Sequence, residues 1–418
     1  MKKPKKKIAF ITPNYLPVNL YGSDYVVKLL AEQFAKNNYD ISVITSNALV
    51  PKYWYVPIFS KKITKRFEII NNVKVYRLDC NQFFSLTCYV LMRHFAFLFG
   101  QKVRNKLKIL YNGPSLKGLK ELLQKEEFDI IHCSPSPLYL NKQVIDIKKT
   151  LKKTPRVIIT PFFHGEVTIY NNPEFKKIFQ NADVVHTISE AEKNDIHKLF
   201  EVQTKNISVI PLFVEFSKHI TDKKLKYEVM EFKKKYKIAD KYIILFAGVK
   251  GSMKGAIDTL SVVNMLYKKN KKYLLVAIGH NTKEWNNTKK NINKNALLDF
   301  GYVDANVKET IFSASDILCM PSKSESFGLV YLEAWHKKKP VIAADIPAVK
   351  NFVGKAVGGL LVPFGNRGKL RDAIERLTKD KAFYEKLAEN GHRSVTTYYN
   401  LENLFKKYKE LFLPSSKT

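Results

Sequence analysis

Short runs of apolar, often β-branched residues alternate along this chain with longer stretches in which apolar positions recur every three or four residues. The runs predict seven β-strands in the first half of the chain, at 7–12, 40–45, 73–78, 128–133, 156–161, 183–188 and 207–212. Between the first two runs, Val26, Val27, Leu30 and Phe34 recur at helical spacing. Strands that alternate with amphipathic helices predict a parallel sheet with helices on both faces.

The second half of the chain repeats this pattern after a charged stretch, 217–241, that contains no strand pattern. Apolar runs predict a helix over 255–268 and six strands, at 242–249, 272–279, 297–303, 316–321, 340–345 and 358–363. An amphipathic pattern over 396–412 predicts a final helix. We therefore predict an α/β protein with two Rossmann-like domains, 1–216 and 217–395, followed by a C-terminal helix and tail, 396–418.

The amino-acid composition limits which kinds of molecule the chain is expected to bind. The chain has 418 residues, 45% of them hydrophobic, which is enough for two cores, and 71 Lys and Arg against 38 Asp and Glu give a net charge of +33. Such a charge favours anionic partners. Only nine of the basic residues are arginines, whose planar fork reads bases, so we expect no specific nucleic-acid binding. Four cysteines without a CxxC spacing predict no zinc site and a cytoplasmic location.

The segment PSKSESFGLVYLEAWH (321–336) carries the main candidate chemistry. A strand is expected to end at Pro321 and a helix to begin near Phe327 or Gly328, which puts Glu325 in the loop and Glu333 in the helix. Free N–H groups at the start of a helix favour a phosphate, and carboxylates accept hydrogen bonds from hydroxyls. A ligand with phosphates in its middle and hydroxyl-bearing rings at both ends, a nucleotide-sugar, fits this pattern.

The same segment resembles the signature of the retaining family 4 glycosyltransferases, in which two glutamates are separated by seven residues. The resemblance extends over essentially the whole chain, and it includes FAGVKGSMKG (246–255), FGYV (300–303), GLLVP (359–363) and the final helix. It implies the GT-B fold, in which two Rossmann-like domains face an interdomain cleft and the C-terminal helix crosses back to the first domain.

The resemblance also implies roles for individual residues. Glu325 is expected to contact the transferred sugar, Glu333 the nucleotide ribose, and Lys254 the diphosphate. Val249 occupies the position of the family's usual arginine, and the adjacent Lys250 is either its substitute or an ordinary surface lysine. The residues expected to be catalytic are Glu325, His164 and Lys254, and those expected to bind the donor are Gly22, Gly248, Lys250, Lys254, Ser326, Phe327, Gly328, Leu329 and Glu333.

The resemblance implies a metal-independent, retaining hexosyltransferase that uses a nucleoside diphosphate sugar as substrate and needs no cofactor. The acceptor is expected to be a glycan or a lipid-linked molecule in the assembly of cell-envelope polysaccharide, glycolipid or protein glycan. Two alternatives stay open: a sugar phosphorylase or epimerase of the same fold, and a basic nucleic-acid-binding protein.

An aromatic stretch in the first half suggests a further partner. Residues 83–100 contain Phe83, Phe84, Tyr89, Phe95, Phe97 and Phe99 beside Arg93 and His94, and a basic stretch, KVRNKLK (102–108), follows. No run reaches the ~20 uncharged apolar residues that span a bilayer. Two interpretations stay open: an internal helix of the first domain, or a peripheral contact with an anionic membrane surface at the cytoplasmic face.

Overall fold

A computed structural model of the chain describes residues 5–18, 20, 22–55, 62–136, 138–163, 172–214 and 221–414. The chain divides into two compact units, which we call unit 1 (Met1–Ile210 and Phe405–Thr418) and unit 2 (Pro211–Leu404). The predicted boundary between residues 216 and 217 lies outside the described residues.

Unit 1 is built on an eight-stranded sheet with the order β3-β4-β2-β1-β5-β6-β7-β8. All neighbouring strands are parallel except β3, which is antiparallel to β4. The seven predicted strands are present, and β3 was not predicted because its side chains alternate, with Phe67 and Ile69 exposed at the sheet edge. The strands are β1 (Lys7–Ile11), β2 (Asp40–Ser46), β3 (Phe67–Ile70), β4 (Val73–Leu78), β5 (Ile130–Cys133), β6 (Arg156–Ile159), β7 (Val184–Thr187) and β8 (Ile207–Val209).

Successive side chains along the strands of unit 1 point to opposite faces of the sheet, and different helices cover the two faces. On one face, Ile11 and Ile131 belong to a core cluster that includes residues of α4 to α7. On the other, Phe10 packs against α1 and the final helix, α16. The helices of unit 1 are α1 (Gly22–Lys36), α2 (Gln82–His94), α3 (Gln101–Leu110), α4 (Leu119–Glu126), α5 (Tyr139–Lys148), α6 (Glu174–Gln180) and α7 (Glu190–Phe200).

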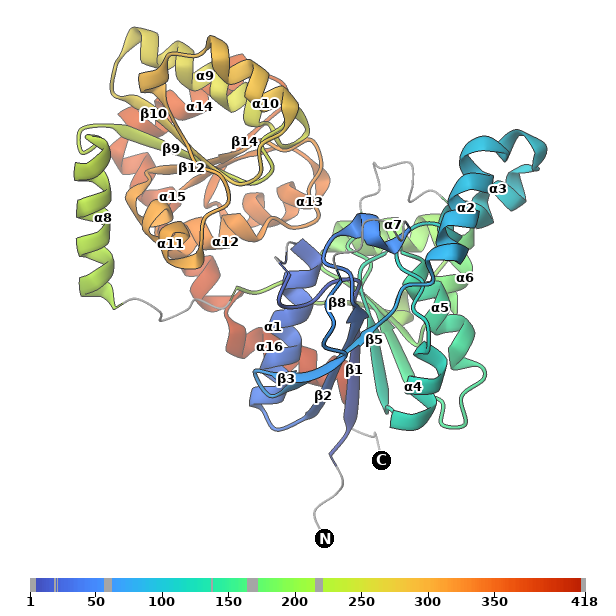
Figure 1. Cartoon of the computed structure of the whole chain (residues 1–418). Coiled ribbons are helices and arrows are strands. Elements are labelled where there is room, and N and C mark those ends of the chain that lie inside the picture. The colour runs from blue at the N-terminus through green and yellow to red at the C-terminus, as the bar shows by residue number, and fades with distance from the viewer. Residues whose placement is uncertain are drawn as a thin grey trace. The chain divides into compact units, whose positions relative to one another are not determined.

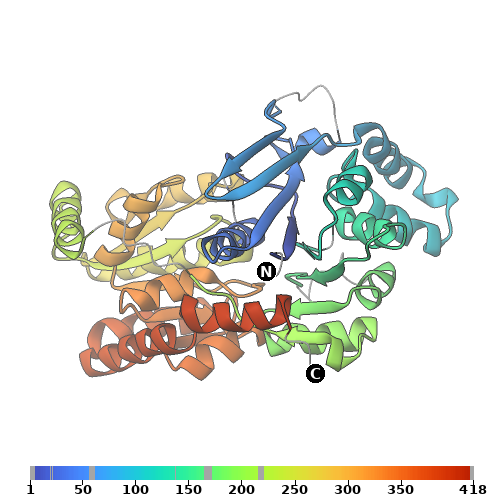
Figure 2. The same ribbon diagram turned by 90° about the horizontal axis from the view of Figure 1, so that it is seen from below.

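The final helix, α16 (Leu401–Phe412), belongs to unit 1 from Phe405 onward, although it is the last helix of the chain. Figures 1 and 2 show it, in dark red, beside the dark blue α1, and the ring centroids of Phe405 and Phe412 both lie 4.9 Å from that of Phe34. The guanidinium of Arg156 donates to the carbonyls of the last helical turn, Leu411 and Phe412, which lack partners within the helix. The predicted return of the C-terminal helix to the first domain is therefore confirmed.

Unit 2 contains a six-stranded, wholly parallel sheet with the order β11-β10-β9-β12-β13-β14. Since β9 is the first of these strands in the chain and β12 the fourth, this is the 3-2-1-4-5-6 order of the Rossmann fold, and the strand order reverses between β9 and β12. All six predicted strands are present: β9 (Tyr242–Ala247), β10 (Tyr273–Ile278), β11 (Leu297–Asp299), β12 (Ile317–Met320), β13 (Val341–Ala344) and β14 (Gly359–Val362).

Helices cover both faces of the second sheet, with α9 and α14 on one face and α11, α12 and α15 on the other (Figure 1). The stretch 217–241, which has no strand pattern, contains the helix α8 in its described part. The helices of unit 2 are α8 (Asp222–Tyr236), α9 (Ala256–Lys269), α10 (Lys283–Thr288), α11 (Ala305–Ala314), α12 (Leu329–His336), α13 (Pro347–Val349), α14 (Arg367–Lys379) and α15 (Lys381–Thr397).

The prediction of one helix over 396–412 is wrong about where that helix begins. Helix α15 ends at Thr397, and α16 begins only at Leu401. The side chain of Asn400 accepts a hydrogen bond from the N–H of Asn403, so Asn400 caps the new helix and separates the two patterns.

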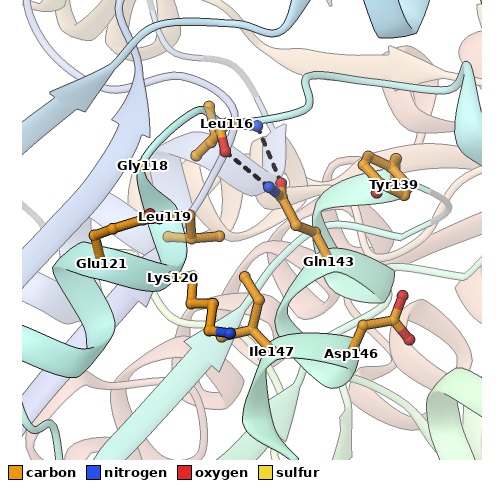
Figure 3. A pocket seen from close by; sticks show the side chains of 9 residues that line it. All are labelled: Leu116, Gly118, Leu119, Lys120, Glu121, Tyr139, Gln143, Asp146 and Ile147. Carbon is orange, nitrogen blue, oxygen red and sulfur yellow. Dashed lines mark hydrogen bonds between the residues drawn. The ribbon is translucent and has the colours of Figure 1, made fainter. Parts of the chain in front are cut away.

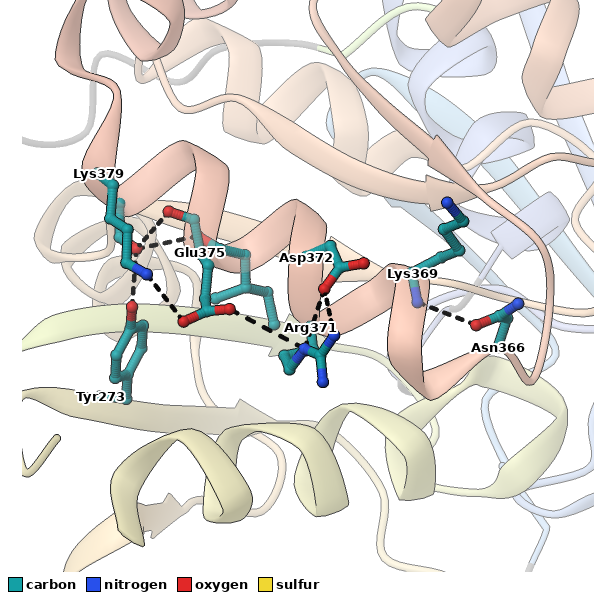
Figure 4. A network of polar contacts seen from close by, with 9 residues as sticks. Tyr273, Asn366, Lys369, Arg371, Asp372, Glu375 and Lys379 are labelled. Atoms are coloured by element: carbon teal, nitrogen blue, oxygen red, sulfur yellow. Dashed lines mark hydrogen bonds and ion pairs between the residues drawn. The ribbon is translucent and has the colours of Figure 1, made fainter. Parts of the chain in front are cut away.

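The solvent-facing side of α14 shows how the many charges of this chain are used on its surface. Lys379 pairs with Glu375 at 3.0 Å, one helical turn away, and Arg371 lies beside Asp372 and Glu375 (Figure 4). Exposed pairs of this kind contribute little to stability, because solvent and salt screen them. These pairs balance opposite charges on the solvent-facing side of α14, and they are not part of the candidate active site.

Among the described residues, no helix combines the length and the apolar character that crossing a membrane requires. The cysteines Cys80, Cys88, Cys133 and Cys319 are all buried and unpaired.

Candidate active site

The loops that follow β9 and β12 meet at the edge of the second sheet where the strand order reverses. In open parallel sheets, ligands bind at this point, beyond the carboxyl ends of the two central strands. The loop after β9 carries Lys254, and the loop after β12 carries Glu325. The topology therefore brings together two predicted site residues that are 71 positions apart in the chain.

Lys254 and Glu325 form an ion pair in which Nζ lies 2.7 Å from Oε2. The same ammonium donates to the backbone carbonyl of Ser324 at 3.2 Å. Both side chains are partly accessible, with 32% of Lys254 and 15% of Glu325 exposed. The pair thus holds one positive and one negative charge at the surface of unit 2, where a ligand can replace solvent.

Two local features hold these loops together. The N–H of Lys323 donates to the carbonyl of Met253 at 2.9 Å, which joins the loops through their backbones. Gly255 has a φ of +76°, and a Cβ there would lie 2.5 Å from the carbonyl oxygen of Pro321. Any other residue would push the loops apart, so the Lys-Gly sequence is explained by the close approach that positions Lys254.

Helix α12 begins at Leu329, directly after the loop that carries Glu325. Gly328 caps it with a φ of +84°, and a Cβ there would lie 2.4 Å from the ring of Tyr331. Gly328 is therefore required by the backbone turn and by Tyr331, whose hydroxyl donates to the Met320 carbonyl. The first N–H groups of α12 have no carbonyl partner within the helix, and the helix dipole favours an anion there. The predicted donor contacts of Ser326, Phe327, Gly328 and Leu329 lie at this helix start, and they stay a prediction.

Glu333 lies on the first turns of α12 and pairs with a lysine that the sequence did not indicate. Its Oε1 lies 2.6 Å from Nζ of Lys308, on α11. Its Oε2 is buried and has no hydrogen-bond partner among the described residues. A buried carboxylate oxygen normally accepts a hydrogen bond, so this atom is free to accept one from a ligand hydroxyl.

The structure argues against the predicted contact of Lys250 with the donor. This side chain is fully buried, its Nζ lies 2.6 Å from Oδ1 of Asp299, and it also donates to the Phe300 carbonyl. Burial lowers the pKa of Lys250, and the ion pair with Asp299 opposes that shift. Binding a phosphate would require this buried pair to break, so Lys250 holds the end of β11 to the loop after β9. Sequence spacing gave no sign of Asp299, which is 49 residues away.

Gly248, the other predicted residue of this loop, lies where β9 and β10 come closest. A Cβ on Gly279 would lie 2.1 Å from the carbonyl oxygen of Gly248, and one on Gly248 would lie 3.2 Å from Met320. Both glycines permit close packing of strand ends, whether or not a ligand is bound.

In unit 1, the loop after β1 leads into α1, which begins at Gly22. Gly22 has a φ of +52°, and a Cβ there would meet no atom within 4 Å. Asp24, in the first turn of α1, accepts from Thr12 Oγ1 at 2.6 Å and from Asn14 Nδ2 at 2.9 Å. These bonds tie the helix start to the loop after β1, which leaves Gly22 exposed at its N-terminal end.

His164 lies outside the described residues. The residue before it, Phe163, is held by Glu192 of α7, whose Oε1 accepts the N–H of Phe163 at 2.5 Å. The other oxygen of Glu192 accepts the N–H of Ile188 at 2.7 Å. Burial raises the pKa of Glu192 to about 7, although the two N–H groups favour its charged form. Glu192 thus joins the ends of β6 and β7, a role that the sequence did not suggest.

A hollow of about 290 Å³ lies elsewhere in unit 1, between α4 and α5 (Figure 3). Gln143 faces it and bonds both the N–H and the carbonyl of Leu116. It contains none of the residues singled out from the sequence.

Comparison with known families accounts for most of the chain. Residues 21–218 match the family described as Glycosyltransferase Family 4, and residues 229–394 match Glycosyl transferases group 1. An uncharacterized glycosyltransferase from Methanocaldococcus jannaschii is 22% identical over 423 aligned positions, which cover 96% of each chain.

Solved structures share the fold of the whole chain. Sucrose-phosphate synthase from Thermosynechococcus elongatus aligns over 98% of both chains with a TM-score of 0.73 and 18% identity. HepE of Anabaena, solved in complex with UDP and glucose, aligns over 97% of this chain and 99% of its own, with a TM-score of 0.69 and 14% identity. Two family matches and a shared architecture lead to one conclusion: the chain belongs to glycosyltransferase family 4 and has the GT-B fold.

Proposed function

We propose that this glycosyltransferase moves a hexose from a nucleoside diphosphate sugar to a hydroxyl of a glycan or lipid-linked acceptor, with retention at the anomeric carbon and without a metal ion. The product would belong to a cell-envelope polysaccharide, a glycolipid or a protein glycan. UDP is the first donor nucleotide to test, because the fold neighbour HepE was solved with UDP and glucose.

The observation that carries the proposal is the pairing of Lys254 with Glu325 beside the start of α12. A diphosphate at this point would meet the ammonium of Lys254 and the first N–H groups of the helix, both of which favour an anion. Glu325 would then exchange its bond to Lys254 for a hydroxyl of the sugar. Glu333 would accept from the ribose through its unpartnered oxygen.

In the proposed reaction, the bond between the anomeric carbon and the donor phosphate oxygen breaks, and a bond from that carbon to the acceptor oxygen forms on the same face. The acceptor hydroxyl gives its proton to an oxygen of the departing diphosphate. The negative charge that develops on the diphosphate is stabilised by Lys254 and by the helix amides, which are fixed before the reaction begins. The chain's share of the chemistry is therefore positioning and charge stabilisation.

The decisive experiment is a donor screen by thermal shift with UDP-, GDP- and ADP-sugars, followed by transfer assays with the best donor. Activity should survive EDTA, because Lys254 and the helix amides supply the positive charge that a metal would otherwise provide. An absolute requirement for manganese would contradict the metal-free mechanism. Turnover of the donor without any acceptor would instead favour a phosphorylase or an epimerase, and an anomerically inverted product would exclude retention.

We also propose that the reaction takes place on the cytoplasmic side of the membrane. The four buried, unpaired cysteines are compatible with a reducing compartment. Fractionation of cells that produce the full chain tests this, and recovery of the protein outside the cytoplasm and its membrane would contradict it.

A further inference from the structure

Helices α2 and α3 form a hairpin, residues 82–110, that extends away from the sheet of unit 1 (Figure 1). A short helical turn, Ala96–Leu98, joins them. The hairpin is anchored at its base, where Ser85 and Cys88 of α2 and Leu107 and Ile109 of α3 are buried. Its tip, residues 93–106, consists of the end of α2, the turn and the start of α3.

Large apolar side chains are exposed at the tip. Phe97 is 77% exposed and Leu98 is 65% exposed, and Phe95 and Val103 are also exposed. Single exposed apolar residues are common on proteins, but adjacent residues of this size at the end of a projecting element mark a binding surface.

The charge around the tip is of one sign. Between Asp79 and Glu121 the sequence contains no Asp or Glu, and it contains seven basic residues, Arg93, Lys102, Arg104, Lys106, Lys108, Lys117 and Lys120. Lys102 and Lys106 lie one helical turn apart on α3, and both are exposed. Exposed aromatic residues beside lysines suit the boundary between lipid headgroups and acyl chains, where rings enter the apolar layer and ammonium groups meet phosphates.

We propose that the tip of this hairpin docks unit 1 onto a bilayer surface that contains anionic lipid. Phe97 and Leu98 insert among the acyl chains, and Lys102 and Lys106 contact the headgroups. Nucleic acid would also attract the lysines, but base reading relies on the planar fork of arginine, and only nine of the 71 basic residues of this chain are arginines. The proposal concerns docking alone and does not depend on the proposed transfer reaction. If that reaction holds, docking brings the enzyme to lipid-linked acceptors.

The test is flotation of the purified full chain with phosphatidylcholine vesicles, either pure or with one-third phosphatidylglycerol. The chain should float with the anionic vesicles at low salt, float less as salt is added, and stay behind with the neutral vesicles. Phe97→Ser with Leu98→Ser should lower the vesicle partition about tenfold or more, since two apolar side chains lose their insertion. Lys102→Glu with Lys106→Glu should lower it by roughly 25-fold, about fivefold for each lysine.

Matched variants make the same changes away from the hairpin. Ile69→Ser with Tyr227→Ser removes two apolar side chains that are 65% and 59% exposed, and Lys223→Glu with Lys226→Glu makes the same charge change on α8. Both controls should float like the parent chain, and circular dichroism should show all four variants folded. The proposal is overturned if the parent does not bind anionic vesicles at low salt, or if the controls lose as much binding as the hairpin variants. Retained vesicle binding in the hairpin variants, with loss of RNA binding, would assign the surface to nucleic acid instead.

Discussion

The two sheets reverse their strand order at equivalent points, but the side chains gathered there differ. In unit 2, the loops after β9 and β12 bring together Lys254 and Glu325, both charged and partly exposed. In unit 1, the corresponding strands are β1 and β5, and Asp24 near that edge is held by a hydroxyl and an amide, from Thr12 and Asn14. The same topology thus places a partly exposed lysine at this edge in unit 2, and in unit 1 an aspartate whose two oxygens already accept hydrogen bonds.

The parallel sheet therefore fixes where a ligand can bind, and the loop side chains determine which charge the ligand can carry. The division of roles, with the nucleotide-sugar bound by unit 2 and the acceptor by unit 1, stays a prediction. The position of a lysine in a loop does not decide its role, as Lys250 and Lys254 show. They lie four residues apart, and one is fully buried while the other is one-third exposed.

The largest expected effect is a difference in unfolding free energy between variants of Lys250 and of Lys254. Lys250→Met should lower the free energy of unfolding of unit 2 by about 3–5 kcal/mol, because Asp299 loses a buried partner. Lys254→Met should cost less than about 1 kcal/mol, because its pair is partly exposed. Chemical denaturation with hydrogen exchange on peptides of unit 2 measures both.

Adding Asp299→Asn to Lys250→Met should recover part of the lost stability, because a carboxylate that keeps only Lys289 and Trp285 as partners is then replaced by a neutral amide. Hydrogen bonds from Lys250, Lys289 and Trp285 now lower the pKa of Asp299 although burial would raise it, so its charge is held by these partners. Equal stability of the Lys250 and Lys254 variants would break the distinction between a structural and a ligand-facing lysine.

The next effect concerns Glu192, the buried carboxylate of unit 1. Its pKa is raised to about 7 from 4.5 because burial disfavours the charged form. The native state therefore holds a proton that the unfolded chain has released between these pH values, and the stability that this proton contributes is lost as pH rises through about 7. Glu192→Gln cannot titrate, so the difference in unfolding free energy between the parent and this variant should change by about 3 kcal/mol from pH 4.5 to 8.

Glu190→Gln, on the same helix but exposed, is the matched control and should leave the pH dependence of unfolding as it is in the parent. Thermal unfolding at a series of pH values gives the comparison. If Glu192→Gln keeps the slope of the parent, other groups carry the pH dependence of unit 1.

A smaller effect tests the catalytic role of the loop pair in unit 2. Lys254→Ala should lower kcat/KM by at least about 30-fold, which is ~2 kcal/mol of transition-state stabilisation, because a fixed cation is removed from the developing diphosphate charge. Glu325→Ala should chiefly lower kcat. Steady-state kinetics with the cognate donor measures both, and wild-type values for the two variants would refute the assignment of this pair.

The smallest effect concerns Glu333, whose free oxygen is proposed to accept from the ribose. Glu333→Ala should weaken donor binding about tenfold, or ~1.4 kcal/mol, with a smaller change in kcat, because one hydrogen bond to a charged group is lost. Isothermal titration with the nucleoside diphosphate gives the affinity directly. Lys308→Met should have a lesser effect, because Lys308 contacts the oxygen that already has a partner. A larger loss for Lys308→Met than for Glu333→Ala would reverse this assignment.

The sequence alone was enough to predict the α/β class, thirteen of the fourteen strands in the described residues, and the strand, loop and helix start around Glu325. Those features are local: a buried parallel strand is a short apolar run, and a helix start needs a glycine or a capping residue beside it. β3 was not predicted because an edge strand with one exposed face carries no such run. The helix break at Asn400 was missed because amphipathic spacing continues across it.

The partner of each charged residue could be seen only once the chain was folded. Lys250 and Lys254 lie in the same short segment, yet Lys250 pairs with Asp299 and Lys254 with Glu325, over separations of 49 and 71 residues. Lys308 beside Glu333, and Glu192 beside Phe163, are likewise paired across different elements. Ion pairs and buried hydrogen bonds depend on distances of a few ångströms between segments that the fold brings together, and residue spacing along one segment carries no information about them.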